Sequence, residues 1–232
     1  MKPSNALIIF AKQPAPGRVK TRLSPPLTPE EGTELYSCML RDTIAMAGRL
    51  PDLHLSIHYQ DDPGAADYFA GLAQGVESWP QVGNDLGQRM KNAFARLFSQ
   101  GFPMVAGIGS DSPDLPGEYI LRAFEMLGGG ADSVFGPAED GGYYLLAMGR
   151  LRNELFSDLP WSSGELLQAS LERARGAGMR VSLLPEWYDM DTCEDLIRAI
   201  DRGGTPSAPL TDDFLRGVDL RGLGAVQHPA TE

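Results

Sequence analysis

Two carboxylates follow directly on a short apolar run in one stretch of the chain. Residues 103–116 read PMVAGIGSDSPDLP, which places Asp111 and Asp114 just after a run that predicts a strand covered on both faces by helices. In open α/β sheets, ligands bind at the carboxyl ends of strands, and carboxylates there can hold a divalent cation against a phosphate. Capping of a turn or of the following helix explains the same two residues equally well.

A second candidate site is the cationic loop after residues 6–11, whose sequence ALIIFA predicts a first buried parallel strand. The loop reads KQPAPGRVKTRL, and its prolines prevent regular structure. Backbone amides around Gly17, with lysine and arginine nearby, suit a diphosphate. Simple solvation of a surface loop is the alternative, although loops after a first buried strand commonly lie at the functional edge of the sheet. The spacing from Gly17 to Lys20 is not that of a P-loop.

Other polar residues lie at predicted turns and helix starts. Asp85 and Arg89 flank the start of a helix, where free amides can receive an anionic or hydroxylated ligand, but Asp85 also serves as a simple cap. Asp140 precedes a double glycine that lets the backbone pass close to a bound molecule or form a tight hairpin. Asp191 comes just before a helix that Thr192 can cap.

Alternating strand and helix patterns must position these residues. Further strands are predicted at residues 53–59, 133–135, 143–148 and 180–184. Helices are predicted at residues 29–50, 65–73, 87–98, 118–127 and 164–175, and after residue 191. The pattern predicts one α/β domain over residues 1–202 with three layers, α/β/α, and a mostly parallel central sheet. Residues 203–232, rich in glycine and proline, are expected to form a loosely ordered tail.

Composition narrows the class of protein. Lys and Arg total 20 against 31 Asp and Glu, so the net charge of −11 argues against binding to nucleic acid or to anionic membranes. No acidic residue precedes Glu30, however, and this basic start can attract a small anion. Two distant cysteines exclude a cysteine zinc site. No apolar run reaches the roughly 20 residues of a membrane span, and we expect a cytoplasmic protein.

Five motifs together resemble a bacterial family of glycosyltransferases in the nucleotide-diphospho-sugar transferase superfamily, which has the glycosyltransferase A fold. In order, the motifs read FAKQPAPGRVKTRL, NDLGQRM, GSDSPDLP, GPAEDGGYYLL and YDMDTCEDL. The resemblance covers residues 6–200. Members of the family are associated with arsenosugar biosynthesis or with radical-SAM gene neighbourhoods.

The resemblance implies roles for individual residues. It implies that the nucleotide diphosphate is held by Ala11, Lys12, Gly17, Lys20 and Arg22. It implies that Asp85 and Arg89 help to hold the nucleoside or the donor sugar, that Asp111 and Asp191 bind the metal, and that Asp140 lies toward the acceptor. The family often has Thr in place of Asp114 and Pro in place of Cys193, so Asp114 is not required as a ligand.

The function that follows is metal-dependent transfer of a sugar from a nucleotide-diphosphate donor to a small acceptor. Mg²⁺ or Mn²⁺ on Asp111 and Asp191 would neutralise the leaving group, Lys20 and Arg22 would add positive charge, and Asp140 would serve as the base if the transfer inverts. One alternative is a nucleotidyltransferase that releases pyrophosphate from a nucleoside triphosphate. Another is a nucleotide-binding module without catalysis.

Overall fold

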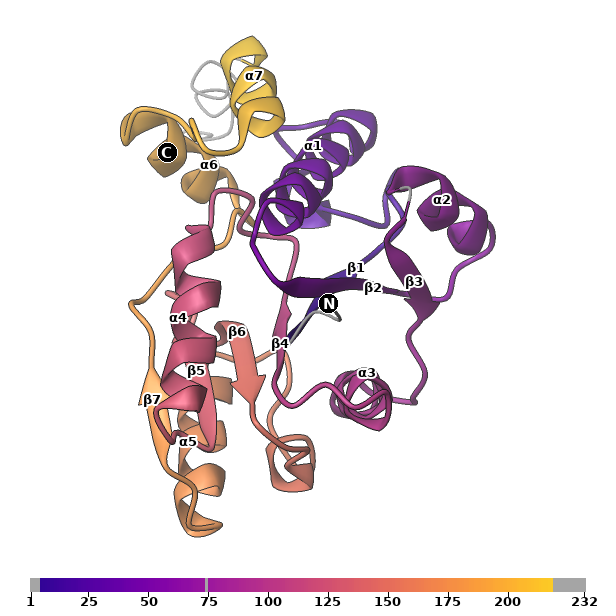
Figure 1. The fold of residues 1–232 in the computed structure, drawn as a ribbon. Coiled ribbons are helices and arrows are strands. Elements are labelled where there is room, and N and C mark those ends of the chain that lie inside the picture. Colours follow the sequence, from indigo (N-terminus) through magenta and orange to yellow (C-terminus); the bar gives the residue numbers. More distant parts are fainter. Residues whose placement is uncertain (1–4, 74, 219–232) are drawn as a thin grey trace.

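A mixed seven-stranded sheet forms the centre of the fold in the described part of the chain, residues 5–73 and 75–218 of the computed structural model (Figure 1). The strand order is β3-β2-β1-β4-β6-β5-β7. Strand β6 runs antiparallel to β4 and β5, and the other neighbours pair in parallel. The strands are β1 (Asn5–Ala11), β2 (Leu53–Tyr59), β3 (Glu77–Pro80), β4 (Val105–Ile108), β5 (Ser133–Pro137), β6 (Tyr143–Met148) and β7 (Val181–Leu183). The predicted single-domain α/β fold is confirmed.

Helices cover both faces of the sheet, which gives three layers (Figure 1). They are α1 (Pro29–Gly48), α2 (Ala65–Leu72), α3 (Leu86–Ser99), α4 (Gly117–Gly128), α5 (Leu166–Gly176), α6 (Cys193–Asp201) and α7 (Pro209–Gly217), with short 3-10 turns at Thr21–Leu23 and Asn153–Leu155. The capping boxes predicted at the starts of α1 and α6 are both present. Each box satisfies free amides at a helix start and so fixes where the helix begins.

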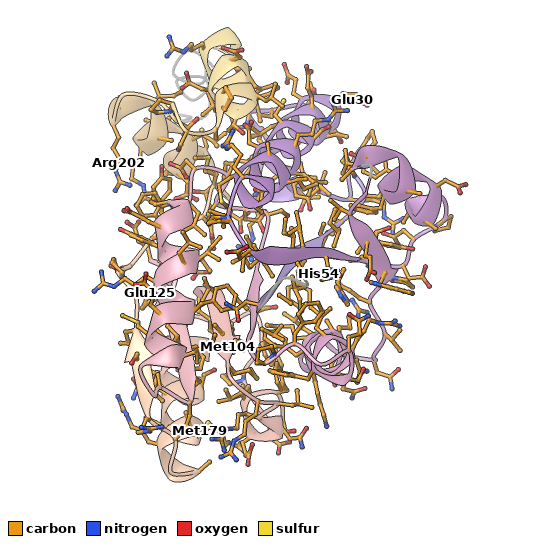
Figure 2. All side chains as sticks on the ribbon, viewed as in Figure 1. Glu30, His54, Met104, Glu125, Met179 and Arg202 are labelled. Carbon is orange, nitrogen blue, oxygen red and sulfur yellow. The ribbon has the colours of Figure 1, made fainter. Side chains whose placement is uncertain are left out.

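The central strands are apolar on both sides because both sides are covered. In β1, Leu7 and Ile9 pack under α1 and α4, whereas Ala6 and Ile8 pack under α3 and α5. Successive side chains of a strand point to opposite faces, so a doubly covered strand reads as a continuous apolar run. Figure 2 shows side chains filling the space between the sheet and these helices, while the exposed Glu125 lies on the outer side of α4.

Two elements were not predicted from the sequence. Strand β3 is a four-residue edge strand that ends in a proline, and such a segment gives little periodic signal. Helix α7 lies within residues 203–232, where we expected a loosely ordered tail. The structure differs there, because α7 packs beside α1 and α6 (Figure 1). Residues 219–232 lie outside the described residues, and for them the tail stays a prediction.

Helix α7 is held by a buried carboxylate of α1. The Asp42 side chain accepts hydrogen bonds from Leu210 N (3.3 Å), Thr211 N (2.8 Å) and Thr211 Oγ1 (2.9 Å). These amides belong to the first turn of α7, whose N–H groups have no partner within the helix. A residue of another helix therefore caps α7, which explains why the sequence around residue 208 shows no capping signal.

Replacing Asp42 should loosen this helix. We expect Asp42→Ala to lower the free energy of unfolding by about 2 kcal/mol, because it leaves buried donors at the start of α7 without a partner. Urea denaturation measures the change. Asp213→Ala, at an exposed position of the same helix, is the control and should stay within about 0.5 kcal/mol of the parent. Equal losses in both variants would contradict the capping role.

His58 on β2 should make stability depend on pH. Its side chain is buried, its Nε2 has no hydrogen-bond partner among the described residues, and burial, with a smaller contribution from Arg96, lowers its pKa to about 4. Because the unfolded chain takes up the proton near pH 6.5, stability is lost as the pH falls from about 6.5 to 4. Lowering the pH from 7 to 5 should reduce the free energy of unfolding by about 2 kcal/mol through His58.

The matched variant for this prediction is His58→Leu, which has no titrating group at the position. The wild type minus the variant gives the contribution of His58, because the other titrating groups are common to both proteins. Denaturant unfolding at both pH values should show a smaller acid-induced loss in His58→Leu. An identical loss in the two proteins would contradict a buried neutral histidine.

None of the helices built from residues 5–73 and 75–218 combines the length and the apolar character needed to cross a membrane.

Candidate active site

Lys20 joins two carboxylates from distant parts of the chain. Its Nζ donates to Asp111 Oδ1 (2.6 Å), to Asp191 Oδ1 (2.8 Å) and to the carbonyl of Met190 (2.9 Å). The Lys20 side chain is only 2% exposed, whereas those of Asp111 and Asp191 are 42% and 41% exposed. The two carboxylates, here called the acid pair, thus converge on one positive charge and still face the solvent.

The topology explains how these residues meet. Strand β4 lies beside β1 in parallel, so the loops after both strands leave the same edge of the sheet. Asp111 follows β4, and Lys20 lies on the loop after β1. Met190 N donates to the carbonyl of Asp111 (2.9 Å), which ties the segment before α6 to the end of β4. The acid pair is therefore fixed by backbone contacts as well as by Lys20.

A tyrosine of α1 fixes the beginning of the cationic loop. The hydroxyl of Tyr36 accepts a hydrogen bond from Lys12 N (2.9 Å) and forms another with Ser110 Oγ (2.9 Å). Burial, with a contribution from the charge of Asp111, raises the pKa of Tyr36 to about 12, so the hydroxyl stays neutral. Tyr36 thereby connects the loop after β1 with the residue next to Asp111. Sequence reasoning placed Tyr36 in a helix and missed this contact.

The charges in the site hold one another ionised. Burial alone would lower the pKa of Lys20, but the charges and hydrogen bonds of Asp111 and Asp191 outweigh it and raise the pKa above its ordinary value. Burial would likewise raise the pKa of Asp191, yet Lys20, with Arg22 and Lys12, holds it below its usual range. Of the cations assigned to the diphosphate, Lys12, Lys20 and Arg22 therefore all act on one carboxylate.

A third carboxyl, that of Asp189, lies beside the acid pair. Ser112 Oγ donates to its Oδ1 (2.6 Å), and burial, together with the negative charges of Asp111, Asp191 and Asp140, raises its pKa to about 7. It borders a cavity of about 120 Å³. The cavity is lined by Ile108, Gly109, Asp111, Ser112, Leu115, Tyr143, Tyr144 and Asp189. Sequence reasoning gave Asp189 no role, although its position two residues before Asp191 places it on the same segment.

The other residues assigned to the diphosphate lie along the loop. Ala11 is the buried last residue of β1, and Lys12 next to it is exposed. Gly17 has a φ of +71°, and nothing lies within 4 Å of the position that a Cβ would take, which agrees with a turn that needs glycine for its dihedral. These positions place the loop over the edge of the sheet at which the acid pair lies.

Three other predicted site residues make local contacts instead. Asp85 caps α3, since its Oδ1 accepts from Gln88 N (2.7 Å), and Arg89 Nε donates to the carbonyl of Gly83 (3.1 Å). Asp140 Oδ1 accepts from Gly142 N (2.8 Å) in the turn between β5 and β6. Asp140 affects the site electrostatically, because its negative charge helps to raise the pKa of Asp189. The nucleoside, sugar and acceptor roles of these three residues stay predictions.

The acid pair fits a divalent cation. The Lys20 ammonium stands in for a cation and shows that two carboxylate oxygens can reach one positive charge. Within the described ranges no group of three or more His, Cys, Asp or Glu side chains is arranged for a metal, so phosphate oxygens and water would have to complete the ligand set. Mg²⁺ is commonly bound in this way, by one or two carboxylates plus substrate phosphates. Asp114 is not part of the pair, because its carboxylate accepts from the hydroxyl of Tyr188.

The fold and the acid pair together define a protein of the nucleotide-diphospho-sugar transferase fold class. A protein from Desulfovibrio desulfuricans G20, provisionally named a nucleotide-diphospho-sugar transferase, superposes with a TM-score of 0.83 at 31% identity, over 92% of this chain and 97% of that one. Residues 43–163 match the model of the family DUF2064, described as an uncharacterized protein conserved in bacteria. The chain belongs to this family. The superfamily indicated by the five motifs is confirmed.

More distant structures share the fold alone. A cytidylyltransferase from Leptospira borgpetersenii serovar Hardjo-bovis (strain JB197) has a TM-score of 0.57 at 11% identity, covering 99% of both chains. Rv0371c from Mycobacterium tuberculosis H37Rv, solved as a complex with manganese, has a TM-score of 0.53 at 16% identity, over 85% of this chain and 98% of that one. The comparison with curated proteins gives no match.

Proposed function

We propose that this protein is a metal-dependent transferase that moves a sugar from a nucleotide-diphosphate donor to a small acceptor. The observation that carries the proposal is the convergence of Lys20 with Asp111 and Asp191 at the carboxyl edge of the sheet. A cationic loop opposite two carboxylates suits a diphosphate that is bridged by a divalent cation. The name of the Desulfovibrio relative supports the same donor class.

In this proposal the acid pair would hold the divalent cation. When bound, Mg²⁺ or Mn²⁺ would neutralise part of the phosphate charge. Lys20 and Arg22 place further positive charge beside the departing diphosphate, which stabilises the leaving group. Ser112 and the carboxyl of Asp189 offer hydrogen bonds to a hydroxyl in the cavity of about 120 Å³. Asp140 is the candidate to take the acceptor proton in an inverting transfer.

A thermal-shift screen tests the donor class. UDP-sugars, GDP-sugars and the free nucleotides are added with and without Mn²⁺, and a ligand that binds the folded state raises the melting temperature. We expect nucleotide-diphosphate sugars to raise it more with Mn²⁺ than without. A shift that does not depend on the cation, with no turnover of any donor, would indicate a binding module and would overturn the catalytic proposal.

A nucleotidyltransferase is the second candidate, because the Leptospira cytidylyltransferase shares the fold over 99% of both chains. In that reaction a phosphorylated substrate attacks the α-phosphate of a nucleoside triphosphate, the bond to the β-phosphate breaks, and pyrophosphate leaves. A pyrophosphate-release assay with each nucleoside triphosphate, run beside a donor-hydrolysis assay with UDP- and GDP-sugars, separates the two reactions. Pyrophosphate release without sugar release would favour the nucleotidyltransferase.

A further inference from the structure

The Lys20 ammonium uses its full hydrogen-bonding capacity on the acid pair. A lysine ammonium has three N–H donors, and Lys20 Nζ has three acceptors, on Asp111, Asp191 and Met190, at 2.6–2.9 Å. In this arrangement no donor remains for a phosphate oxygen. Lys20 therefore cannot bind a diphosphate while its ammonium makes all three of these contacts.

A divalent cation bound to the acid pair would occupy the position that Lys20 Nζ now holds. Mg²⁺ binds oxygen ligands at about 2.0–2.1 Å, and the oxygens that converge on one point are the same two that hold Lys20 Nζ. An ammonium and a divalent cation repel each other and cannot both occupy the point between these oxygens. The side chains of both acids are about 40% exposed, so the cation has access from the solvent.

The backbone at Lys20 favours such a movement. Lys20 has left-handed dihedrals, φ 49° and ψ 36°, and precedes the short turn Thr21–Leu23 without a side-chain cap. A residue other than glycine in this region is strained and persists only when its surroundings hold it there. The Lys20 carbonyl accepts from Leu23 N (3.0 Å), and the ammonium is held by the acid pair and by Met190, so losing the ammonium contacts removes part of what holds the residue in this conformation.

The structure assigns Lys20 a dual role: it bridges the acid pair when no cation is present, and it is displaced by the divalent cation toward the donor phosphates. This inference rests on the proposed function for the identity of cation and donor. In the free protein, Lys20 keeps two negative charges close together. In the protein with bound cation and donor, Lys20 contacts the leaving group instead.

Cation binding without nucleotide tests the displacement. Isothermal titration with Mn²⁺ alone compares Lys20→Met with Arg22→Met, which removes a neighbouring charge that makes no hydrogen bond to the acid pair in the structure. We expect Lys20→Met to bind Mn²⁺ about tenfold more tightly than Arg22→Met, because no ammonium has to leave first. Donor binding should become weaker in the same Lys20→Met protein. Mn²⁺ affinity equal to or below that of Arg22→Met would overturn the inference.

Chemical labelling of wild-type protein gives a second readout that needs no substitution. Acetylation of lysine amines, followed by mass spectrometry, should modify the exposed Lys12 at one rate with or without Mn²⁺, and modify Lys20 only slowly until Mn²⁺ is added. Asp111→Asn should speed the modification of Lys20 even without Mn²⁺. Binding of Mn²⁺ in the titration with no change at Lys20 would overturn the displacement.

These outcomes are distinguishable from failure of the proposed function. The Mn²⁺ affinities and the labelling rates, which decide the inference, are measured with Mn²⁺ alone and require no donor. If Lys20 responds to Mn²⁺ but no nucleotide or nucleotide-sugar shifts the melting temperature, the displacement stands and the donor class is wrong. If nucleotide-sugars are turned over while Lys20 stays protected in the presence of Mn²⁺, the function stands and the displacement is wrong.

Discussion

Asp111→Asn should reduce turnover of the donor by about 10²–10³-fold while the protein stays folded. The amide has the shape of the carboxylate but not its charge, so half of the acid pair no longer attracts a divalent cation. Folding should survive, because the side chain is 42% exposed and the backbone carbonyl still accepts from Met190 N. Turnover is measured with the donor found in the thermal-shift screen, and circular dichroism checks the fold.

Asp114→Asn is the matched control for this prediction. Asp114 is three residues further along the same loop, but it is buried and bonded to Tyr188 instead of Lys20. We expect this variant to lose stability and to keep its turnover, the opposite of Asp111→Asn. Unchanged turnover in Asp111→Asn would remove Asp111 from the site.

Local patterns were sufficient to predict most of the fold. Strands covered on both faces read as apolar runs, as at β1, and β2 alternates between apolar and polar residues along Leu53–Tyr59, so both were found within a residue of their ends. The alternation indicated an exposed polar face on β2, whereas Ser56 and His58 are buried. The capping box around Thr28 marked the start of α1 in the same way. By contrast, α7 depends on a cap supplied by Asp42, which is 169 residues away from Thr211, and no local pattern reports such a contact.

The site was predictable in part for a similar reason. Parallel strands that neighbour each other end at the same edge, so loops after β1 and β4 can be expected to meet, and the structure brings Lys20 and Asp111 together. The ammonium between the two carboxylates could not be predicted, because it joins residues that are 91 and 171 positions apart. The buried carboxyl of Asp189 was missed because its environment is created by folding.

Gly141→Ala should be strongly destabilising, by about 3–4 kcal/mol of unfolding free energy. Gly141 has a φ of +85°, where a side chain strains the backbone, and a Cβ there would lie 2.0 Å from the carbonyl oxygen of Gly164. That oxygen belongs to backbone and cannot rotate away. Moreover, the carbonyl of Gly141 accepts from Leu167 N (2.9 Å), so a shift of the turn would also disturb the start of α5. Urea denaturation measures the loss.

Gly17→Ala separates the two causes. Gly17 also has a positive φ, +71°, but nothing lies within 4 Å of the position of its Cβ. This variant should therefore lose only about 1 kcal/mol, the cost of the dihedral alone. The difference between the two variants reports the collision with Gly164, which clamps the turn that carries Asp140. Equal losses would mean that the turn moves freely, and Asp140 could then not be held at a fixed distance from the acid pair.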